Sequence, residues 1–477
     1  MEEKLMGKPK KHVKFFEFLT VFSTAIGITI GVGIYLKNDT SEGHLLYFTQ
    51  NPYLSIGLWI LVGILGMAMI MVFIEVTSVK TKSGHGTLPS WANVLIGRQV
   101  GSLVALFYIF FYFPILLGIF PIFSINAMFE GIEEQSISKG TQHIIAIIVG
   151  LVILILFYLI NIFLRNAGKW VQTIGTFIKF IPLIVSLVIG FVAPIENNVF
   201  NKYKELNFGN FFMGILPVLF SFDGFIYAAG LQKEVSNKNV VPKALFAAML
   251  FITIFYILEV ISLFLGTNDG SVFTLFKNLL GGPVAKILMW FIMLTALMSI
   301  NGLTFVAPSF GHTVQEENLV YIGKKELSYQ QIGLIQMTIT VCFNLVLMGL
   351  SLGVVGDPMY LLDLSSNAVS FTAFLCYISL IIAVCVNRYT KRVEVTKVKG
   401  IYYYAGFSLF LLIGSIGYIM YNFFAYSSNY KTLYSLLIII GETLIIWGIN
   451  ELLLWHKATP ADGEIKIKTP LINNVNQ

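Results

Sequence analysis

Apolar runs of about 20 residues recur from one end of this 477-residue chain to the other, and each is long enough to cross the hydrocarbon core of a bilayer as a helix. Only 12% of the residues are charged, against about 25% in an average soluble domain. The runs are continuously apolar, whereas the strands of a membrane β-barrel alternate. The sequence therefore predicts an all-α polytopic membrane protein with almost no soluble domain.

The runs predict twelve transmembrane helices, at about 15–36, 53–76, 100–128, 141–163, 168–193, 211–231, 242–265, 282–311, 330–352, 359–387, 401–425 and 431–455. An even number of spans places both termini on one side of the membrane. The loops on that side carry 23 of the 31 lysine and arginine residues, the opposite loops carry 7, and the remaining one is Lys179. Because cytoplasmic loops are enriched in basic residues, we predict a multi-pass plasma-membrane protein with both termini in the cytoplasm.

The first run contains a segment, residues 25–35, that is a poor helix former. Gly27, Gly31 and Gly33 alternate there with β-branched residues, and both kinds of residue lower helix propensity. Such a segment can unwind, as the broken helices of secondary transporters do around their substrates. The alternative is close helix packing, because Gly27 and Gly31 also form a GxxxG pair.

The sixth run carries a second interruption, Phe222-Asp223-Gly224, with Pro217 shortly before it. The two interruptions lie five helices apart, so a second five-helix unit would cross the membrane in the opposite sense. Paired interruptions in two halves indicate an inverted repeat with a site between them, and they favour unwinding over simple packing. The domains expected are a tail at 1–14, a first repeat at 15–200, a second at 201–399, two further helices at 400–455 and a tail at 456–477.

Three segments of the chain carry recognisable motifs. They are IGVGIY at 30–35, Asn161 with GK at 168–169, VQ at 171–172 and KFIP at 179–182, and FSFDG at 220–224 with QKEV at 232–235 and VPKA at 241–244. Together these segments resemble the amino acid–polyamine–organocation (APC) transporter superfamily. The resemblance implies an amino acid permease with a 5+5 inverted repeat (the LeuT/APC-like fold), broken helices 1 and 6 and two extra C-terminal helices. One departure lies at Ser309-Phe310-Gly311-His312, where many relatives have an arginine and small residues.

Unwound backbone offers free amides to a carboxylate and free carbonyls to an ammonium group, and an α-amino acid carries both. The resemblance implies that the amides of Val32 and Gly33, next to Gly31, bind the carboxylate. It implies that the carbonyls of Thr29, Phe220 and Asp223, next to Gly224, bind the amine, and that Leu303 faces the substrate. The alternative for Phe220 is ordinary packing.

The side chain of Asp223 has three possible roles: it binds a cationic substrate, it titrates, or it caps the second half of helix 6. The cap is slightly favoured, because aspartate is common at helix starts.

Lys179 is about 11 residues into the fifth helix, or roughly 16 Å along its axis, too deep to reach either surface easily. An ionisable group at that depth indicates function by default. In some proton-coupled relatives a helix-5 lysine replaces a sodium ion, so the resemblance implies that Lys179 couples proton movement to transport. The alternative is a static cation held by backbone carbonyls.

For several other polar residues the sequence indicates only burial or exposure, or shows no functional spacing. Glu259 is expected to be buried, and Glu75, Glu442 and Glu451 are expected to face solvent or lipid headgroups. The remaining candidates, His85, His312 and Asp363, show no metal-binding or catalytic spacing. The sequence has no GxxxxGK[ST] loop, nucleophile elbow or zinc motif, so neither an enzyme nor a cofactor is expected, and the net charge of +6 does not indicate nucleic-acid binding.

These observations predict secondary active transport of an amino acid by alternating access, with the lipid bilayer and the amino acid as partners. Proton symport is the favoured energy source, and exchange of two amino acids is close behind. The alternatives are a polyamine or organic-cation carrier, to which Asp223 would be relevant, and a non-transporting nutrient sensor on the same fold.

Overall fold

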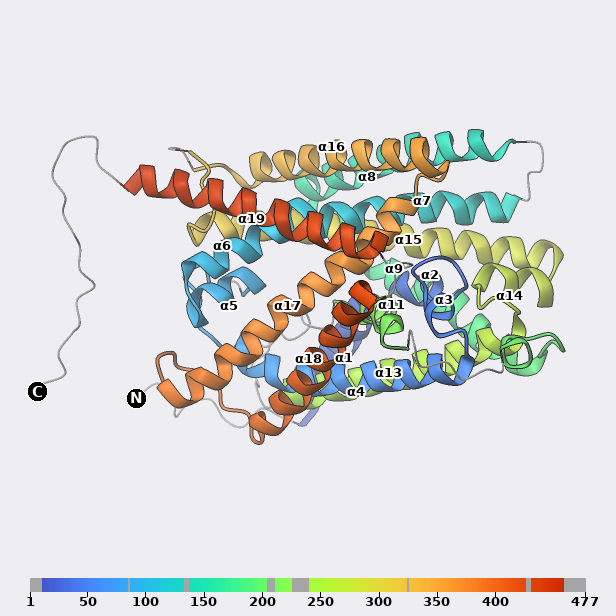
Figure 1. The fold of residues 1–477 in the computed structure, drawn as a ribbon, viewed down its shortest axis with the longest axis horizontal. Coiled ribbons are helices and arrows are strands. Elements are labelled where there is room, and N and C mark those ends of the chain that lie inside the picture. The colour runs from blue at the N-terminus through green and yellow to red at the C-terminus, as the bar shows by residue number, and fades with distance from the viewer. Residues whose placement is uncertain are drawn as a thin grey trace, which may run out of the picture.

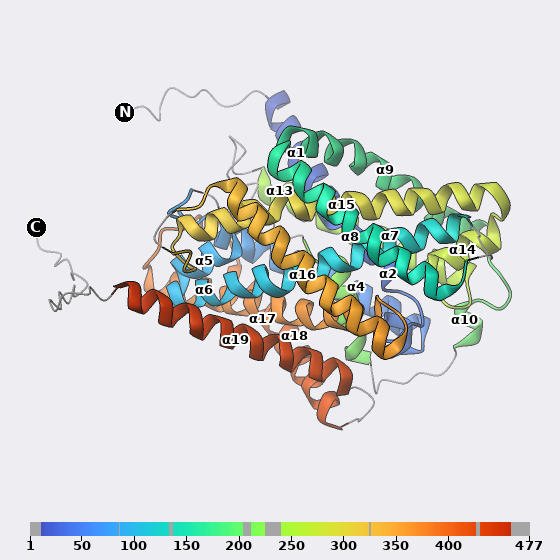
Figure 2. The ribbon, with the colours of Figure 1, turned by 90° about the horizontal axis from the view of Figure 1, so that it is seen from above.

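The computed structural model describes residues 11–84, 86–132, 137–203, 211–224, 240–323, 326–425 and 430–458, and these ranges contain helices and loops but no strand. Most of the long helices run along one common axis, and α17 (Tyr360–Thr390) and α18 (Ile401–Ala425) cross it at an angle (Figure 1). The short helices α2 (Gly33–Leu36) and α3 (Leu45–Thr49) lie in the half of the bundle away from α5 (Leu88–Leu95) (Figure 1). Helix α5 lies in the other half (Figures 1 and 2).

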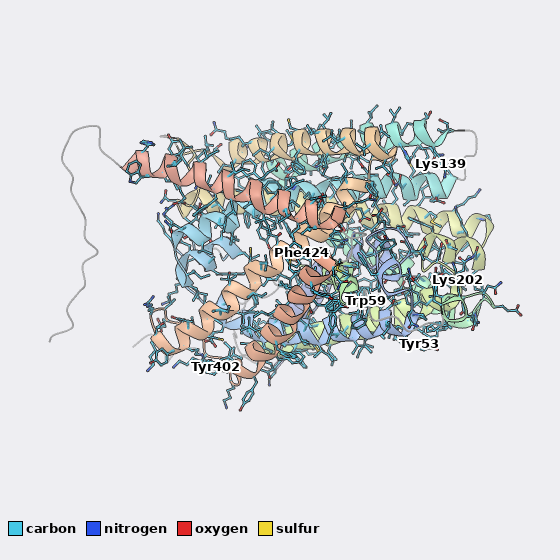
Figure 3. All side chains as sticks on the ribbon, in the orientation of Figure 1. Tyr53, Trp59, Lys139, Lys202, Tyr402 and Phe424 are labelled. Atoms are coloured by element: carbon cyan, nitrogen blue, oxygen red, sulfur yellow. The ribbon has the colours of Figure 1, made fainter. Side chains whose placement is uncertain are left out.

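Nine helices of the described ranges are long and apolar enough to cross a membrane. Large apolar side chains cover the outside of the bundle, as expected for a surface that faces lipid: Phe424 is 76% exposed and Tyr402 is 59% exposed, while Trp59 lies fully buried among the helices (Figure 3). The nine are α4 (Pro52–Thr77), the span Arg98–Ile132, α8 (Lys139–Phe163), α13 (Val241–Gly266), α15 (Gly282–Glu316), α16 (Tyr329–Val355), α17, α18 and Lys431–His456 within α19 (Tyr430–Ala458).

Three further apolar helices complete the described part of the bundle. They are α9 (Arg165–Val192), α1 (Lys11–Thr29) and α11 (Ile215–Phe222). All three lie within or close to predicted spans. The inverted repeat, the count of twelve spans and the domain boundaries remain predictions.

The first span is interrupted where the glycines predicted it. Helix α1 ends at Thr29, residues 30–32 are not helical, and α2 begins at Gly33. The amide of Ile30 still donates to the carbonyl of Ile26 at 2.8 Å, so the α-helical pattern continues for one residue beyond α1 and then stops.

The described helical part of the sixth span ends just before Asp223, and we call this end the second interruption. Helix α11 follows a 3₁₀ turn, η3 (Phe211–Gly214), and ends at Phe222. Asp223 takes an extended conformation (φ −59°, ψ 143°) and Gly224 has φ +109°, a backbone conformation that favours glycine. The expected second half of this helix and the segment QKEV at 232–235 lie outside the described residues.

Part of the connection between the predicted spans at 53–76 and 100–128 forms the short helix α5. Thr87 precedes this helix, and Pro89 lies in its first turn, where a missing amide hydrogen costs nothing. Short helices also occupy three other connections: α3, α10 (Val199–Lys202) and α14 (Val272–Leu279).

The third span contains a feature that the sequence analysis missed. Helices α6 (Arg98–Phe107) and α7 (Phe113–Ile132) are joined by a π-helical turn, η2 (Tyr108–Tyr112). The turn ends two residues before Pro114, which cannot donate an α-helical hydrogen bond. Such turns insert an extra residue and re-aim the side chains around them.

Candidate functional site

The two interruptions lie directly against each other. A Cβ atom built on Gly33, at the start of α2, would lie 2.6 Å from the Cα atom of Ser221 in α11. No side chain fits there unless the backbone moves. The absence of a side chain at Gly33 therefore allows this close approach between the two broken spans, which the sequence predicted to act together.

Tyr256 of α13 connects the two interruptions. Its hydroxyl lies 3.2 Å from the carbonyl oxygen of Thr29 and 3.3 Å from that of Ser221. The Thr29 carbonyl, expected to receive the substrate amine, therefore already has a donor from the protein, although a carbonyl oxygen has a second lone pair.

Two aromatic rings hold Tyr256 in place. The ring centroids of Trp59 and Phe222 lie 5.1 and 5.2 Å from that of Tyr256. The indole nitrogen of Trp59 donates in turn to the side chain of Asn38 at 3.1 Å. Tyr256 is thus a fixed part of the site, although one tyrosine in an apolar helix gave no sequence signal.

The carboxylate of Asp223 lies among hydroxyl groups. Tyr112 of the π-helical turn donates to it at 2.5 Å and Tyr377 of α17 at 3.1 Å, and the amide of Gly224 donates at 2.9 Å. Within the described residues, no lysine, arginine or histidine lies within 4 Å of this carboxylate. Sequence reasoning found Asp223 but missed both tyrosines, which come from helices far away along the chain.

The remaining predicted substrate contacts surround the first interruption. Phe220 is buried, and the Nζ atom of Lys37 lies 4.9 Å from the centre of its ring. Among the described residues, a Cβ atom on Gly31 would meet only the Ser299 hydroxyl of α15, at 3.8 Å. Leu303 lies about one turn further along α15 and is partly buried against the core. The structure therefore brings α2, α11 and α15 to the same region.

Lys179 lies on α9 and is 3% exposed. Its Nζ atom donates to the carbonyl oxygen of Gly27 at 3.4 Å, in the last turn of α1 before the interruption. Among the described residues it has no acidic partner. The side chain thus links α9 to the first broken span, an arrangement consistent with either role predicted for it.

Glu259 of α13 is fully buried, as predicted. One carboxylate oxygen is hydrogen-bonded to the hydroxyl of Ser186 in α9. The other oxygen has no partner within the described part of the chain.

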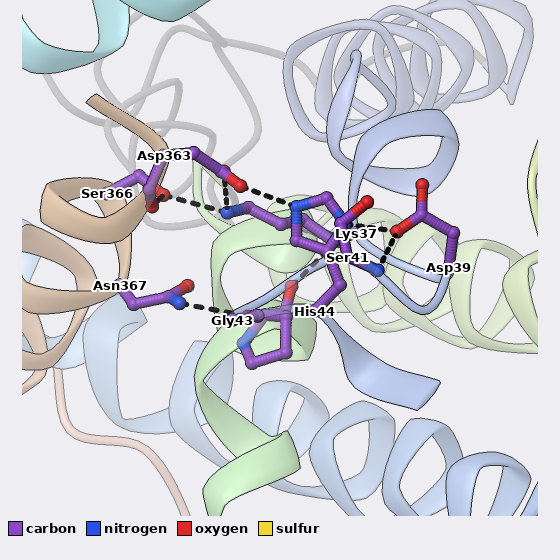
Figure 4. A network of polar contacts seen from close by, with 10 residues as sticks. Lys37, Asp39, Ser41, Gly43, His44, Asp363, Ser366 and Asn367 are labelled. Atoms are coloured by element: carbon purple, nitrogen blue, oxygen red, sulfur yellow. Dashed lines mark hydrogen bonds and ion pairs between the residues drawn. The ribbon is translucent and has the colours of Figure 1, made fainter. Parts of the chain in front are cut away.

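A cluster of charged residues at the α2 end of the bundle was missed by sequence reasoning. We define the α2-end cluster as Lys37, Asp39, His44 and Asp363 (Figure 4). Lys37 forms an ion pair with Asp363, in the first turn of α17, and the two ring nitrogens of His44 lie 2.6 Å from oxygens of Asp39 and Asp363. Asp363 is 319 or more positions from its partners, and no local pattern signals such a contact.

The predicted exposure of Glu75 is wrong. Glu75 is fully buried and accepts two hydrogen bonds from Arg388, at 2.6 and 2.7 Å. The segment after α17 covers it, since the amide of Val398 also donates to Glu75 at 2.8 Å. Glu451 is 16% exposed and pairs with Arg98, while Glu442 is exposed, as predicted.

The fold and site define a class: a multi-pass helical membrane protein with two interrupted spans that meet inside the bundle. A model of the amino acid permease family matches residues 16–449, so the chain belongs to that family. It is therefore an integral membrane protein of an amino acid transport family.

Two relatives are similar along much of the chain. The serine/threonine exchanger SteT of Bacillus subtilis is 24% identical over 395 residues, which cover 81% of this chain and 85% of that protein. An uncharacterized protein of Mycoplasma pneumoniae is 24% identical over 352 residues, which cover 64% of this chain; the chain spans 60% of that relative's length.

Proposed function

We propose that this protein is a secondary active transporter that carries an amino acid across the plasma membrane by alternating access, with both termini in the cytoplasm. The substrate binds between the two interrupted spans. The observation that carries the proposal is the contact of Gly33 with Ser221, which sets the two interruptions side by side. Membership of the amino acid permease family supports the same substrate class.

The substrate carboxylate binds at the first interruption. Val32 is 1% exposed, and within the described residues the amides of Val32 and Gly33 have no hydrogen-bond acceptor. A buried donor without a partner costs about 1–3 kcal/mol. A bound carboxylate would accept from both amides.

The substrate amine binds on the side of α11, at the carbonyls of Phe220 and Asp223 and the remaining lone pair of Thr29. We propose that Asp223 contributes its negative charge here, held in position by Tyr112 and Tyr377. Gly224 allows the backbone to turn away at this point, and Leu303 of α15 limits the space left for the substrate side chain.

Lys179 is proposed to couple proton movement to transport, because its hydrogen bond to Gly27 places it against the first broken span. Release of its proton would weaken that contact and favour a different position of α1. The second candidate function is exchange of two amino acids, which the relative named as a serine/threonine exchanger favours. The same name makes serine and threonine the first substrates to test.

Uptake by the purified full chain in liposomes tests the proposal. Labelled serine or threonine entering empty vesicles in response to a proton gradient supports symport, and entry only into vesicles preloaded with unlabelled amino acid supports exchange. Binding without either kind of uptake contradicts transport. Lys179→Ala should fold and remove the pH dependence of uptake, and unchanged pH-driven uptake by this variant contradicts the role of Lys179.

A further inference from the structure

The loop between α2 and α3 is fastened to the start of α17. In addition to the ion pair of Lys37 with Asp363, the side chain of Asn367 donates to the carbonyl of Gly43 at 3.0 Å (Figure 4). The side chains involved are shielded: Lys37 is 0% exposed, His44 is 4% and Asp363 is 13%. This end of the bundle is thus closed by contacts between the loop and α17.

The hydrogen bonds of His44 indicate its protonation state. Each ring nitrogen lies 2.6 Å from a carboxylate oxygen, one of Asp39 and one of Asp363. Ionised carboxylates only accept hydrogen bonds, so both ring nitrogens must carry a proton. The imidazole is therefore in its charged form while this end is closed.

The neighbouring charges favour that form. Burial by itself would lower the pKa of His44, but the charges of Asp363 and Asp39 and their hydrogen bonds raise it from 6.5 to about 9. Burial would likewise raise the pKa of Asp39, but the charge of His44 and hydrogen bonds from His44 and Ser41 hold it below its usual value. The α2-end cluster then contains two positive and two negative groups.

Other titratable groups near the loop do not change this balance. Glu42 pairs with Lys431 of α19 and accepts a hydrogen bond from Tyr360 of α17. Helices α2 and α3 contribute only Tyr35 and Tyr47, and a tyrosine is ordinarily neutral below about pH 10.

The α2-end cluster lies over the candidate substrate site. Lys37 contacts both Asp363 and the ring of Phe220 in α11, so the ion pair and the second interruption share a residue. Asp363 belongs to α17, whereas Lys37 and His44 belong to the loop that continues from α2. Any opening of this end that moves α2 away from α17 must separate His44 from Asp363.

We propose that His44 is a proton-binding site that is filled when the α2 end closes and emptied when it opens. The proposal rests on the alternating-access function proposed above. On opening, His44 loses one of its two carboxylate partners and gains contact with water, so its proton affinity returns toward that of an ordinary histidine. The released proton goes to the solution on that side, and a proton from the same solution is bound on closing. This site is separate from Lys179.

The expected pH dependence follows from the two states of His44. Below about pH 6.5 both the open and the closed state hold the proton, and above about pH 9 neither state does. Between these values closing takes up one proton. Each unit of pH increase in this window should therefore shift the ratio of closed to open protein by up to about tenfold toward open.

Nitrogen NMR of the full chain with ¹⁵N-labelled histidine tests the protonation state directly, with His44→Gln to assign the signal among the six histidines. We expect the His44 signal to report the doubly protonated ring at pH 7.5, and its titration to move down by at least about one unit in Asp363→Asn. Asp39→Asn serves if that variant does not fold. The signal of His312, whose ring lies near Glu316 in the last turns of α15 and near Tyr329, should be the same in all variants. A singly protonated His44 at pH 7.5 would overturn the proposal.

A labelling experiment tests the link to opening. Ser370 is 1% exposed and lies one turn deeper along α17 than Ser366. For labelling, the three native cysteines are replaced by serine and Ser370 is replaced by cysteine (Ser370→Cys). We expect this cysteine to react with a maleimide only when the α2 end opens. We expect its rate, divided by that of exposed Ser41→Cys, to rise with pH between 7 and 9. The same rise in a His44→Gln background would overturn the proposal.

These two measurements do not depend on transport. If NMR and labelling give the expected results but the purified chain moves no amino acid, the proposed function fails and the proton-binding site remains. If uptake occurs but His44 is neutral in the closed state, the proposed function remains and this inference fails.

Discussion

Helix α17 makes an ionic contact at each of its ends, and the two contacts differ in chemistry. Its 31 residues span about 46 Å. In the first turn Asp363 binds Lys37 and His44 of the loop after α2, and in the last turn Arg388 binds Glu75 of α4. One helix therefore connects both ends of the bundle to broken or neighbouring spans.

The contact at the α5 end is a two-point pair with a guanidinium group. The Nε and Nη2 atoms of Arg388 donate to the two oxygens of Glu75, and Nη2 also donates to the carbonyl of Val398 at 2.7 Å. A guanidinium group stays charged throughout the accessible pH range. This contact is therefore insensitive to pH for as long as Glu75 remains ionised.

The contact at the α2 end includes an imidazole, whose charge changes within the physiological range when its surroundings change. One helix is thus held at its last turn by a contact that does not depend on pH and at its first turn by a contact that does. In an alternating-access cycle, such a difference would let the solution on the α2 side influence which end opens.

Arg388→Ala should have the largest effect on stability. It leaves the fully buried Glu75 without its cation, and removal of one partner from a buried ion pair costs about 3–5 kcal/mol. The free energy of unfolding in mixed micelles measures the loss. The exposed Arg392→Ala should change it by less than about 0.5 kcal/mol, and equal effects for the two variants would contradict the importance of the α5-end contact.

The stabilisation by His44 should depend on pH in the sense set by its raised pKa. The contribution of His44 to the free energy of unfolding is fully present below pH 6.5 and is lost as the pH rises through about 9. This contribution is at most about 3 kcal/mol, because one pKa unit corresponds to 1.36 kcal/mol. The stability difference between the wild type and His44→Gln should therefore shrink from pH 6 to pH 9.5. A stability difference that stays constant with pH would contradict the claim that only the contact at the α2 end depends on pH.

Lys431→Ala should have the smallest effect. Its partner Glu42 belongs to the same loop as His44, but the two side chains are 39% and 32% exposed. Exposed ion pairs contribute about 0–1 kcal/mol. The thermal unfolding temperature of this variant should therefore stay close to that of the wild type. A loss of stability as large as that of Arg388→Ala would show that burial does not explain the difference between the Lys431–Glu42 and Arg388–Glu75 ion pairs.

Local sequence was sufficient for the features that depend on composition. The apolar runs located the nine helices of the described ranges that are long enough to cross a membrane. Glycine with β-branched residues located the end of α1 near Thr29. The pair Asp223-Gly224 located the second interruption, because an acidic residue and a glycine fit poorly inside an apolar helix. The short helix α5 was missed because its eight residues form no apolar run.

Long-range contacts could not be predicted in this way. Tyr112, Tyr377 and Tyr256 are ordinary aromatic residues of apolar helices until folding brings them to the interruptions. Asp363 meets His44 across 319 positions, which leaves no spacing to recognise. Glu75 was predicted to be exposed because it lies near a helix end, and the chain after α17 folds back to cover it.

Amino acid uptake by Gly33→Ala, measured beside Gly31→Ala in liposomes, tests most directly the claim that the substrate binds where the two interruptions meet. An added Cβ atom would lie 2.6 Å from the Ser221 backbone at Gly33 but 3.8 Å from its nearest neighbour, the Ser299 hydroxyl, at Gly31. With both variants folded and inserted, we expect Gly31→Ala to keep uptake within about threefold of the wild type and Gly33→Ala to lose more than about tenfold, because small displacements of binding groups carry large costs. Equal uptake by the two variants would contradict the account.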